Sequence, residues 1–441
     1  MRILQVNHGY PMRYNAGSEV YTRTLTHGLA ERGHEPSVFA RFEDPHQPEY
    51  TLIEERDGRV PVYLANMARS QHRFQADPLD QRFADLVRTI RPDVVHFHHL
   101  NHLSLGLPRV AARTGAKVVY TVHDFWLACP RGQLLQWGLG QQPWELCPGQ
   151  DDHRCAENCY ARCHSGLADF AQQDLRYWRA WVHARMAAVE AVLPSINAFV
   201  CPSRTVMDAL VGRFPGIADR TIFRDYGFPQ LTTRRRERAP EEPFTFGYIG
   251  THIAQKGLDQ LIRAFLRVKG DPRLSIWGRP RAQSTPNLQA LARPAGDRIS
   301  FEGEYENGEV GDRVLSQVDA IVVPSIWLEN SPLVIHEAQQ ARLCVVTANA
   351  GGMAELVEHE TNGLLFQHRD EADLASQMQH LVDMPGLAER LGERGYIRRT
   401  DGSVPTSEDD ARFMERLYRQ LHGERGVPRH FTTESIGEVS A

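Results

Sequence analysis

This sequence has little cysteine, no excess of positive charge and no long apolar run, and each shortage excludes a class of protein. It carries 50 Lys and Arg residues against 55 Asp and Glu residues in 441, a formal charge of −5. That balance argues against a nucleic-acid binder that works by neutralising phosphates. No run approaches the roughly 18 apolar residues that a membrane-spanning helix needs. Seven cysteines are too few for a secreted disulfide scaffold, so we expect a cytoplasmic protein.

Lysine is the scarcest of the charged residues. Only three of the 50 basic residues are lysines, and the other positions are arginines. The three are Lys117, Lys256 and Lys269. A position that is lysine against this bias can require a compact ammonium group rather than a planar guanidinium, although chance also explains any single one.

Short apolar runs alternate with helical patterns along the chain, which is typical of βαβ units and a parallel sheet. The length suits two or three domains, and the strands fall into two sets, each large enough for a doubly wound domain. In the first set we expect strands at 2–6, 36–40, 93–97 and 117–122. In the second set we expect them at 244–249, 273–277, 299–301, 319–323 and 343–347. Helices are expected at 18–31, 258–268, 309–317 and 332–341.

The polar segment 230–243, which is bracketed by prolines, is the expected linker between the two domains. The N-terminal domain is then 1–229, with an insertion that contains cysteines at about 129–165, and the C-terminal domain is 244–404. A helix at 405–422 is expected to pack back, followed by a tail at 423–441.

The segment 324–337, PSIWLENSPLVIHE, carries the strongest local signal. Ser331 is predicted to be the N-cap of a helix and Pro332 its first residue. The N–H groups of the first turn would favour an anion such as a diphosphate. Glu329 before the helix and Glu337 within it could then accept hydrogen bonds from hydroxyl groups. The alternative is a pair of glutamates without partners.

The spacing of Glu329 and Glu337 resembles the E-x7-E motif of the retaining glycosyltransferases of family 4, which have the GT-B fold. The flanking ENSPLVIHEA, with GGMAE at 351–355 and TNGLLF at 361–366, fits that family as well. The resemblance implies that Glu337 binds the ribose hydroxyls of a nucleotide-sugar donor and that Glu329 contacts the donor sugar as a catalytic residue. It also implies that the diphosphate is held at Ser331, Pro332, Leu333 and Val334.

The loop after the predicted strand 244–249 supports this resemblance. Gly250 permits a ligand to approach the backbone closely, and Lys256 can reach a phosphate as a point charge. By itself, a solvated loop lysine explains the position equally well. The family loop carries an arginine and then a lysine, so the resemblance implies that Lys256 is the catalytic, diphosphate-binding lysine. Thr251 stands in place of the arginine, and Arg279 is a candidate substitute.

Two positions in the N-terminal half fit the same family. The segment NAGSE at 15–19 opens a helix, and Gly17 would let backbone N–H groups approach a phosphate or an acceptor. Ala16 departs from the usual Gly-Gly pair. His123 ends a predicted strand in VVYTVHD, where a lone histidine is commonly structural. The resemblance implies instead that His123 lies beside the transferring sugar as a catalytic residue.

A histidine cluster and a cysteine cluster each allow more than one interpretation. Four histidines fit either a wall of the acceptor site or a metal site: His96, His98, His99 and His102. Four cysteines fit a structural zinc site, unpaired thiols or disulfides, because their C-x7-C-x3-C-x3-C spacing lacks tight C-x2-C pairs. They are Cys147, Cys155, Cys159 and Cys163.

We therefore expect a GT-B enzyme with two Rossmann-like domains facing across a cleft. It would transfer a sugar, with retention, from a UDP-, GDP- or ADP-sugar to a saccharide or lipid-linked acceptor in surface polysaccharide or glycoconjugate biosynthesis. No D-x-D triplet is present, so no catalytic cofactor is expected. An amphipathic helix at 169–193 packs on the sheet or contacts the inner face of a membrane. The alternatives are a sugar-nucleotide epimerase of the same fold and a non-catalytic nucleotide-sugar-binding protein.

Overall fold

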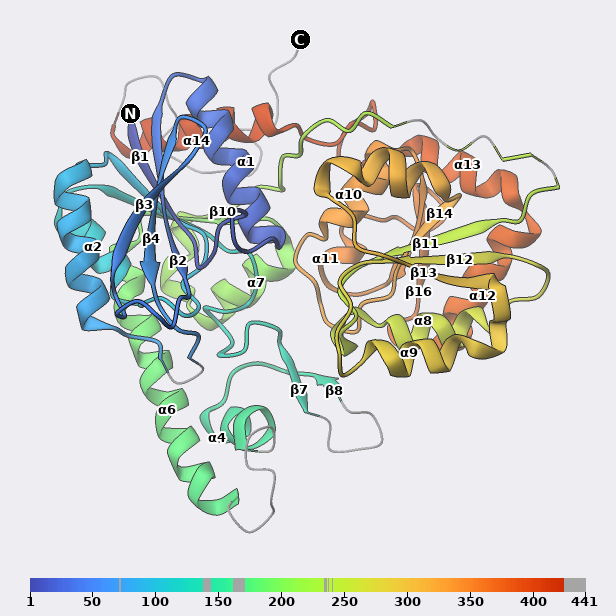
Figure 1. Cartoon of the computed structure of the whole chain (residues 1–441), viewed down its shortest axis with the longest axis horizontal. Helices are drawn as coiled ribbons and strands as arrows, with labels where there is room; N and C mark the ends of the chain where they lie inside the picture. The colour runs from blue at the N-terminus through green and yellow to red at the C-terminus, as the bar shows by residue number, and fades with distance from the viewer. Residues whose placement is uncertain are drawn as a thin grey trace. The chain divides into compact units, whose positions relative to one another are not determined.

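The computed structural model of the protein describes residues 1–70, 73–137, 144–161, 171–233, 236, 238–239 and 241–423. The chain divides into two compact units (Figure 1). One is Met1–Gly227 with the described residues from Thr406 onward, and the other is Phe228–Pro405. The predicted tail, apart from Gly423, and part of the predicted linker lie outside the described residues.

The first unit contains an eight-stranded sheet in the order β10-β9-β6-β5-β1-β2-β4-β3. Its pairs are parallel except for β3, which is antiparallel to β4. The strands are β1 (Arg2–Val6), β2 (Glu35–Phe42), β3 (Leu52–Asp57), β4 (Val60–Asn66), β5 (Val94–Phe97), β6 (Lys117–Thr121), β9 (Ala198–Cys201) and β10 (Thr221–Phe223). The central strands are buried along their length, as helices on both faces of a parallel sheet require.

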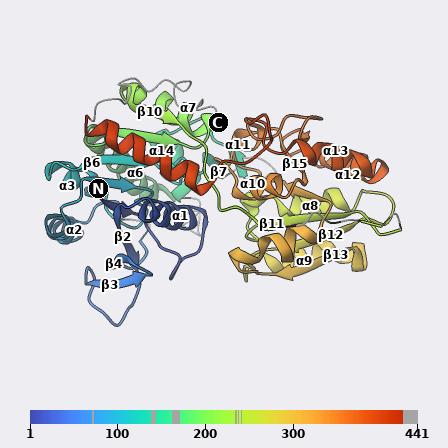
Figure 2. The same cartoon turned by 90° about the horizontal axis from the view of Figure 1, so that it is seen from above.

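Helices connect these strands, and the last one returns from the far end of the chain. They are α1 (Gly17–Glu31), α2 (Asp77–Ile90), α3 (Leu107–Arg113), α6 (Ala171–Val192), α7 (Arg204–Arg213) and α14 (Ser407–Leu421). A capping box between Thr406 and Asp409 starts α14, and its buried face packs on α1 (Figure 2). Arg32 Nε donates to Glu415 Oε2 at 2.6 Å across this helix pair.

The insertion after β6 forms a short hairpin, a turn of helix and the long helix α6, which is the long green helix in Figure 1. Its short elements are β7 (Leu135–Trp137), β8 (Trp144–Leu146), α4 (Asp152–Arg154) and a π-helical turn at Cys155–Ala161. The predicted apolar stripe of α6 is buried at Trp178, Val182, Met186 and Val189. No helix among the described residues is long and apolar enough to cross a membrane.

The second unit contains a six-stranded, fully parallel sheet in the order β13-β12-β11-β14-β15-β16. The strands are β11 (Thr245–Ile249), β12 (Arg273–Trp277), β13 (Ile299–Gly303), β14 (Ala320–Val323), β15 (Cys344–Ala348) and β16 (Gly363–Phe366). This is the doubly wound order in which the chain reverses direction across the sheet between its first and fourth strands. The switch point of this sheet lies between β11 and β14. In open parallel sheets, ligands commonly bind at the switch point.

Helices lie on both faces of this sheet. Figure 1 shows α8 and α9 on one side of the strands and α10 on the other. They are α8 (Leu258–Phe265), α9 (Thr285–Ala292), α10 (Leu333–Gln340), α11 (Gly351–Ala354), α12 (Glu371–Asp383) and α13 (Pro385–Arg394). The two doubly wound, Rossmann-like sheets confirm the predicted fold class.

One predicted helix is wrong, and the described residues of the predicted linker make contacts in the second unit. The predicted helix 309–317 is a succession of π and 3-10 turns, in which Val310, Val314 and Leu315 are buried. Residues of the predicted linker pack within the second unit: Leu231 N donates to Gln340 Oε1 at 3.0 Å, and Arg236 Nη1 donates to Asp319 Oδ2 at 3.2 Å.

Candidate functional site

Two loops meet at the switch point of the second unit, one after β11 and the other after β14. Ile326 N donates to the carbonyl oxygen of Gln255 at 3.0 Å, which ties the loops together. Gly257 has φ +66°, and a Cβ atom there would overlap with the carbonyl oxygen of Pro324. Only glycine fits this position, so the loop that carries Lys256 lies directly against the loop that carries Glu329.

The structure brings the two predicted catalytic residues of this unit into contact. Lys256 Nζ donates to Glu329 Oε1 at 2.7 Å, and Ser325 Oγ donates to the same oxygen at 2.6 Å. The ammonium group also lies 5.6 Å from the ring centroid of Trp327. Glu329 is 5% exposed. A ligand phosphate that approaches Lys256 must therefore share the ammonium group with this carboxylate or displace it.

A second glycine contact fixes the backbone of Glu329, which has φ +30°. Gly352 N donates to the carbonyl oxygens of Leu328 and Glu329 at 3.0 and 3.1 Å. A Cβ atom at Gly351 would overlap with the carbonyl group of Leu328, and one at Gly352 with that of Asn330. The unusual dihedral of a non-glycine residue is thus held by surrounding hydrogen bonds, as at many functional sites.

The start of α10 differs from the prediction. The helix begins at Leu333, and its N-cap is Pro332 with ψ 120°, not Ser331. The extended ψ of Pro332 moves the helix start one residue along the chain. The N–H groups of Leu333 and Val334 belong to the first turn, where the helix dipole favours an anion.

Glu337 lies one turn into α10 and is partly buried. Burial raises the pKa of its carboxyl group to about 7, and neighbouring His336 opposes the shift. Tyr305 is close enough for the Glu337 charge to raise the pKa of the Tyr305 hydroxyl, after burial as the main cause. A carboxyl group with this pKa changes its charge near neutral pH, so a ligand hydroxyl that donates to it would favour the ionised form.

Gly250 and Arg279 lie at the same edge of the sheet. Gly278 has φ +132°, and a Cβ atom there would overlap with the carbonyl group of Gly250. Arg279, the candidate for the missing cation, accepts a hydrogen bond from His252 N at its carbonyl oxygen. Its half-exposed guanidinium pairs with Glu304 at 3.0 Å. The structure thus places Arg279 on the loop beside Gly250, already paired with a carboxylate.

In the first unit, His123 belongs to a buried chain of hydrogen bonds. Its Nδ1 lies 2.7 Å from the Tyr226 hydroxyl and its Nε2 lies 3.1 Å from His98 Nδ1. His98 Nε2 continues to Gln5 Oε1 at 2.7 Å. Burial and the neighbouring histidines hold the pKa values of His98 and His123 well below the ordinary value, so both rings are neutral at pH 7.

The other predicted histidines serve different contacts. His96 lies 2.7 Å from the Tyr418 hydroxyl of α14 and 2.8 Å from Thr121 Oγ1. His99 Nε2 lies 3.1 Å from Asp124 Oδ2, and His102 Nδ1 lies 3.3 Å from the carbonyl oxygen of Ser70.

Gly17 opens α1 as predicted, after Ala16 in an extended conformation. The first turn of this helix already holds a carboxylate, because Glu19 is 3% exposed and its Oε1 lies 3.2 Å from His8 Nε2. Sequence reasoning missed His8, Glu19 and Asp124. The available signal for His8 and Asp124 was a polar residue two positions after each of two predicted strands; Glu19 lies in the segment NAGSE, in the first turn of α1.

The predicted cysteine cluster is only partly described, because Cys163 lies outside the described residues. Cys147 Sγ donates to the carbonyl oxygen of Gly149 at 3.1 Å, and burial raises the pKa of the Cys155 thiol to about 12. Within the described ranges, no group of three or more His, Cys, Asp or Glu residues is arranged to hold a metal ion.

Protein stability should report the raised pKa of Glu337. The folded pKa of about 7 lies above the ordinary 4.5, so the folded state binds more protons and unfolding free energy falls as pH rises between these values. Glu337→Gln removes this penalty. The variant should gain stability relative to the wild type as pH rises, by at most about 3 kcal/mol above pH 7. Urea unfolding between about pH 5 and pH 8, with exposed Glu358→Gln as control, measures this; a difference independent of pH would contradict it.

Comparison with known proteins agrees with this geometry. Residues 15–222 match the family model "Glycosyltransferase Family 4", and residues 230–398 match "Glycosyl transferases group 1". A glycogen synthase of Mycobacterium tuberculosis is 25% identical over 91% of this chain and 90% of its own length.

Two solved structures share the fold across the whole chain. A sucrose-phosphate synthase from Thermosynechococcus elongatus has a TM-score of 0.69 at 19% identity and covers 96% of this chain and 99% of its own. HepE of Anabaena, solved in complex with UDP and glucose, has a TM-score of 0.60 at 16% identity and covers 96% and 98%. Together, the two family models span most of this chain, which therefore belongs to the GT-B glycosyltransferases.

Proposed function

We propose that the protein is a retaining glycosyltransferase that moves a sugar from a nucleotide-sugar donor to a saccharide or glycolipid acceptor. The single observation that carries this proposal is the contact between Lys256 and Glu329 at the switch point of the second sheet. It joins a cation for a leaving diphosphate to a carboxylate for a reacting sugar. The first turn of α10 follows only a few residues later on the same loop.

Each group has a defined task in this proposal. The N–H groups of Leu333 and Val334 and the Lys256 ammonium stabilise the negative charge that grows on the departing diphosphate. Glu337 accepts hydrogen bonds from the ribose hydroxyls. Glu329 contacts the donor sugar. When the diphosphate binds Lys256, the Glu329 carboxylate is released from its ion pair and can accept hydrogen bonds from that sugar. These groups supply positive charge that a divalent metal supplies in other enzymes, so transfer should survive EDTA treatment.

His123 is proposed to contact the transferring sugar through its neutral ring. The Tyr226 hydroxyl and His98 hold the two ring nitrogens, which fixes the orientation and the tautomer of the imidazole. A preoriented, neutral group can stabilise positive charge at the anomeric carbon without first losing a proton.

The donor and the acceptor are open to test. The neighbour HepE was solved with UDP and glucose, so UDP-glucose is the first donor to try, followed by GDP- and ADP-sugars. Surface polysaccharide or glycoconjugate assembly is the proposed setting. NMR of the product reveals the anomeric configuration, and product analysis separates transfer from epimerisation and from binding without turnover.

Lys256→Ala should lower turnover by about 100- to 1,000-fold, because its interaction strengthens as the leaving diphosphate gains charge. Lys256→Arg should restore only part of the rate, since a planar fork does not reproduce a compact ammonium group. Steady-state transfer by the three proteins measures this. A fall below about fivefold in the Ala variant would mean that another cation, such as Arg279, carries the phosphate.

Glu329→Gln should bind UDP more tightly than the wild type while it transfers sugar more slowly. Removal of the carboxylate charge frees Lys256 for the diphosphate, which should raise UDP affinity about three- to tenfold. UDP carries no sugar, so loss of the sugar contact does not affect this measurement. Titration calorimetry with UDP tests it, and Glu358→Gln removes the same charge from an exposed site. Equal or weaker UDP binding by Glu329→Gln would show that the ion pair does not compete with the phosphate.

Tyr226→Phe should lower kcat about tenfold or more, by analogy with the loss of a hydrogen bond that orients a metal-ligating histidine, and leave donor KM within about twofold. Tyr10→Phe is a control, because that buried residue also loses one side-chain hydrogen bond of its hydroxyl, to Asp57 Oδ2 at 2.9 Å, outside the His123 chain. Both variants should lose similar stability, but only Tyr226→Phe should slow turnover. Equal losses of kcat in the two variants would show that Tyr226 contributes to packing and does not position His123.

A further inference from the structure

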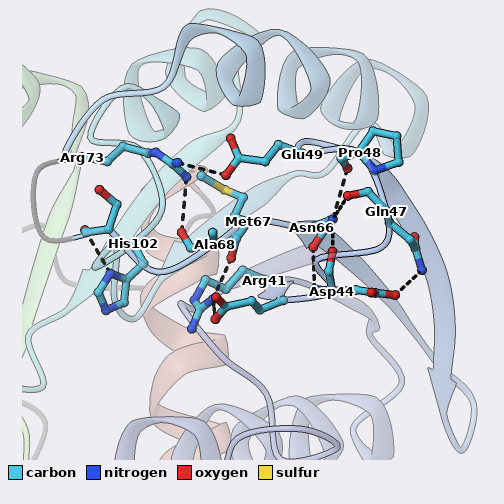
Figure 3. A network of polar contacts seen from close by, with 12 residues as sticks. Arg41, Asp44, Gln47, Pro48, Glu49, Asn66, Met67, Ala68, Arg73 and His102 are labelled. Atoms are coloured by element: carbon cyan, nitrogen blue, oxygen red, sulfur yellow. Dashed lines mark hydrogen bonds and ion pairs between the residues drawn. The ribbon is translucent and has the colours of Figure 1, made fainter.

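A second polar network lies in the first unit, at the carboxyl ends of β2 and β4 (Figure 3). Its centre is Arg41, near the end of β2, which is 1% exposed. Arg41 Nη1 donates to the carbonyl oxygen of Met67 at 2.8 Å, and Nε is buried without a hydrogen-bond partner among the described residues. A buried guanidinium is costly unless it is paired, so its counter-charge must be identified.

Only one carboxylate among the described residues pairs with Arg41. Glu43 Oε2 lies 3.6 Å from Arg41 Nη1, and its side chain is 40% exposed. A second cation lies close by: the Cζ atoms of Arg41 and Arg69 are 4.9 and 5.4 Å from the ring centroid of Tyr14. Burial lowers the pKa of Arg41, and the charge of Arg69 contributes to the shift. Two guanidinium groups thus lie beside the Tyr14 ring. One half-exposed carboxylate, that of Glu43, pairs with Arg41.

Within the described part of the chain, the other two acidic residues of this network pair with neither Arg41 nor Arg69. Asp44 accepts hydrogen bonds from His46 N and from Gln47 Nε2, both at 2.9 Å. Glu49 Oε1 pairs with Arg73 Nη2 at 3.0 Å. These contacts leave Glu43 as the one carboxylate that the described residues pair with Arg41. Arg69 is exposed and forms no ion pair within the described part of the chain.

The loops that carry these groups are held rigidly. Asn66 Nδ2 donates to the carbonyl oxygens of Asp44, Gln47 and Pro48 at 3.0, 2.8 and 3.1 Å, and Asn66 Oδ1 accepts from Asp44 N at 2.9 Å (Figure 3). The buried Asn66 side chain therefore holds the backbone of residues 44–48, which follow β2. A site whose supporting backbone is already fixed loses less entropy when it binds a ligand.

The network adjoins the switch point of the first sheet, between β1 and β5. Tyr14 lies in the loop after β1, and a Cβ atom at Gly9 would meet both the Tyr14 side chain and the carboxylate of Glu19. His102, in the loop after β5, has its pKa lowered to about 4 by burial and by Arg41. It is neutral at pH 7 and adds no charge. The two guanidinium groups beside Tyr14 therefore lie near the edge where an open parallel sheet binds ligands.

We propose that Arg69, Tyr14 and Arg41 form a subsite for an anionic group of the glycosyl acceptor, either a phosphate or a carboxylate. Exposed Arg69 donates to the anion directly, with the forked geometry that suits both groups. Arg41 lies in contact with the same ring, where it orients Tyr14 and adds positive potential. This inference rests on the proposed function, because it names the acceptor class of that enzyme.

The test measures binding of small acidic sugars to the full chain with UDP present. Glucose 6-phosphate and glucuronate probe the two anion chemistries, and glucose is the neutral control. The wild type should bind one or both acids and not glucose. Arg69→Gln should weaken that binding about ten- to a hundredfold. Exposed Arg82→Gln on α2 removes the same charge elsewhere and should have no effect.

The outcomes separate this inference from the proposed function. UDP affinity should be the same in the wild type, Arg69→Gln and Arg82→Gln, which shows an intact donor site. Arg41→Lys keeps the buried charge and should retain most binding of the acidic sugar. Equal binding by Arg69→Gln and the wild type, binding lost equally in Arg82→Gln, or no binding of either acid while UDP binds normally would overturn the acceptor subsite. Absence of UDP binding in every protein would instead overturn the proposed function.

Discussion

The close approach of Gly257 to the carbonyl group of Pro324 is the constraint on which the candidate site depends. Backbone atoms occupy the space that any side chain at 257 would need, so only a glycine there lets the loops after β11 and β14 lie this close together. Their contact places Lys256 within 2.7 Å of Glu329. Gly351 and Gly352 act on the other side of the Glu329 loop in the same way. Three positions without side chains thus determine where two charged side chains lie.

The two charges at this contact neutralise each other when no ligand is bound. Glu329 is almost fully buried, and an unpaired carboxylate there would be costly. The pair therefore stabilises the buried carboxylate, and any phosphate that approached Lys256 would compete with Glu329 for the ammonium group. The carboxyl group of Glu337 avoids a buried, unpaired charge in a different way. No ion pair of Glu337 is found among the described residues, and burial raises its pKa to about 7 against the opposing effect of His336.

The first unit shows a third way to accommodate polar groups beneath a binding edge. His96, His98 and His123 are kept neutral by burial and joined to hydroxyl and amide groups. This arrangement needs no counter-ion. It also links the histidines to α14, the last helix of the described chain, through Tyr418. Arg41 cannot become neutral in this way, since a guanidinium keeps its proton at any physiological pH.

Much of the framework followed from the sequence. Alternation of short apolar runs and helical patterns predicted two parallel sheets, and both β1 and β12 have the predicted bounds. Strand β3 was not predicted, because Leu52–Asp57 is an edge strand whose charged residues face solvent. The apolar spacing of segment 309–317 predicts a helix, yet the segment forms π and 3-10 turns, which such spacing does not distinguish from an α-helix.

The sequence by itself also determined which charged residues follow the strand ends, Lys256 and Glu329 in loops and Glu337 in the next helix, because local spacing and strand ends locate these segments. Only the tertiary structure decided which of them touch. The Lys256–Glu329 pair joins residues 73 positions apart, and Tyr14, Arg41 and Arg69 come from three separate loops and strands. The start of α10 at Leu333, rather than after a Ser331 cap, follows from the extended ψ of Pro332. Contacts of this kind depend on strand order and on backbone approach at single glycines, which local periodicity does not encode.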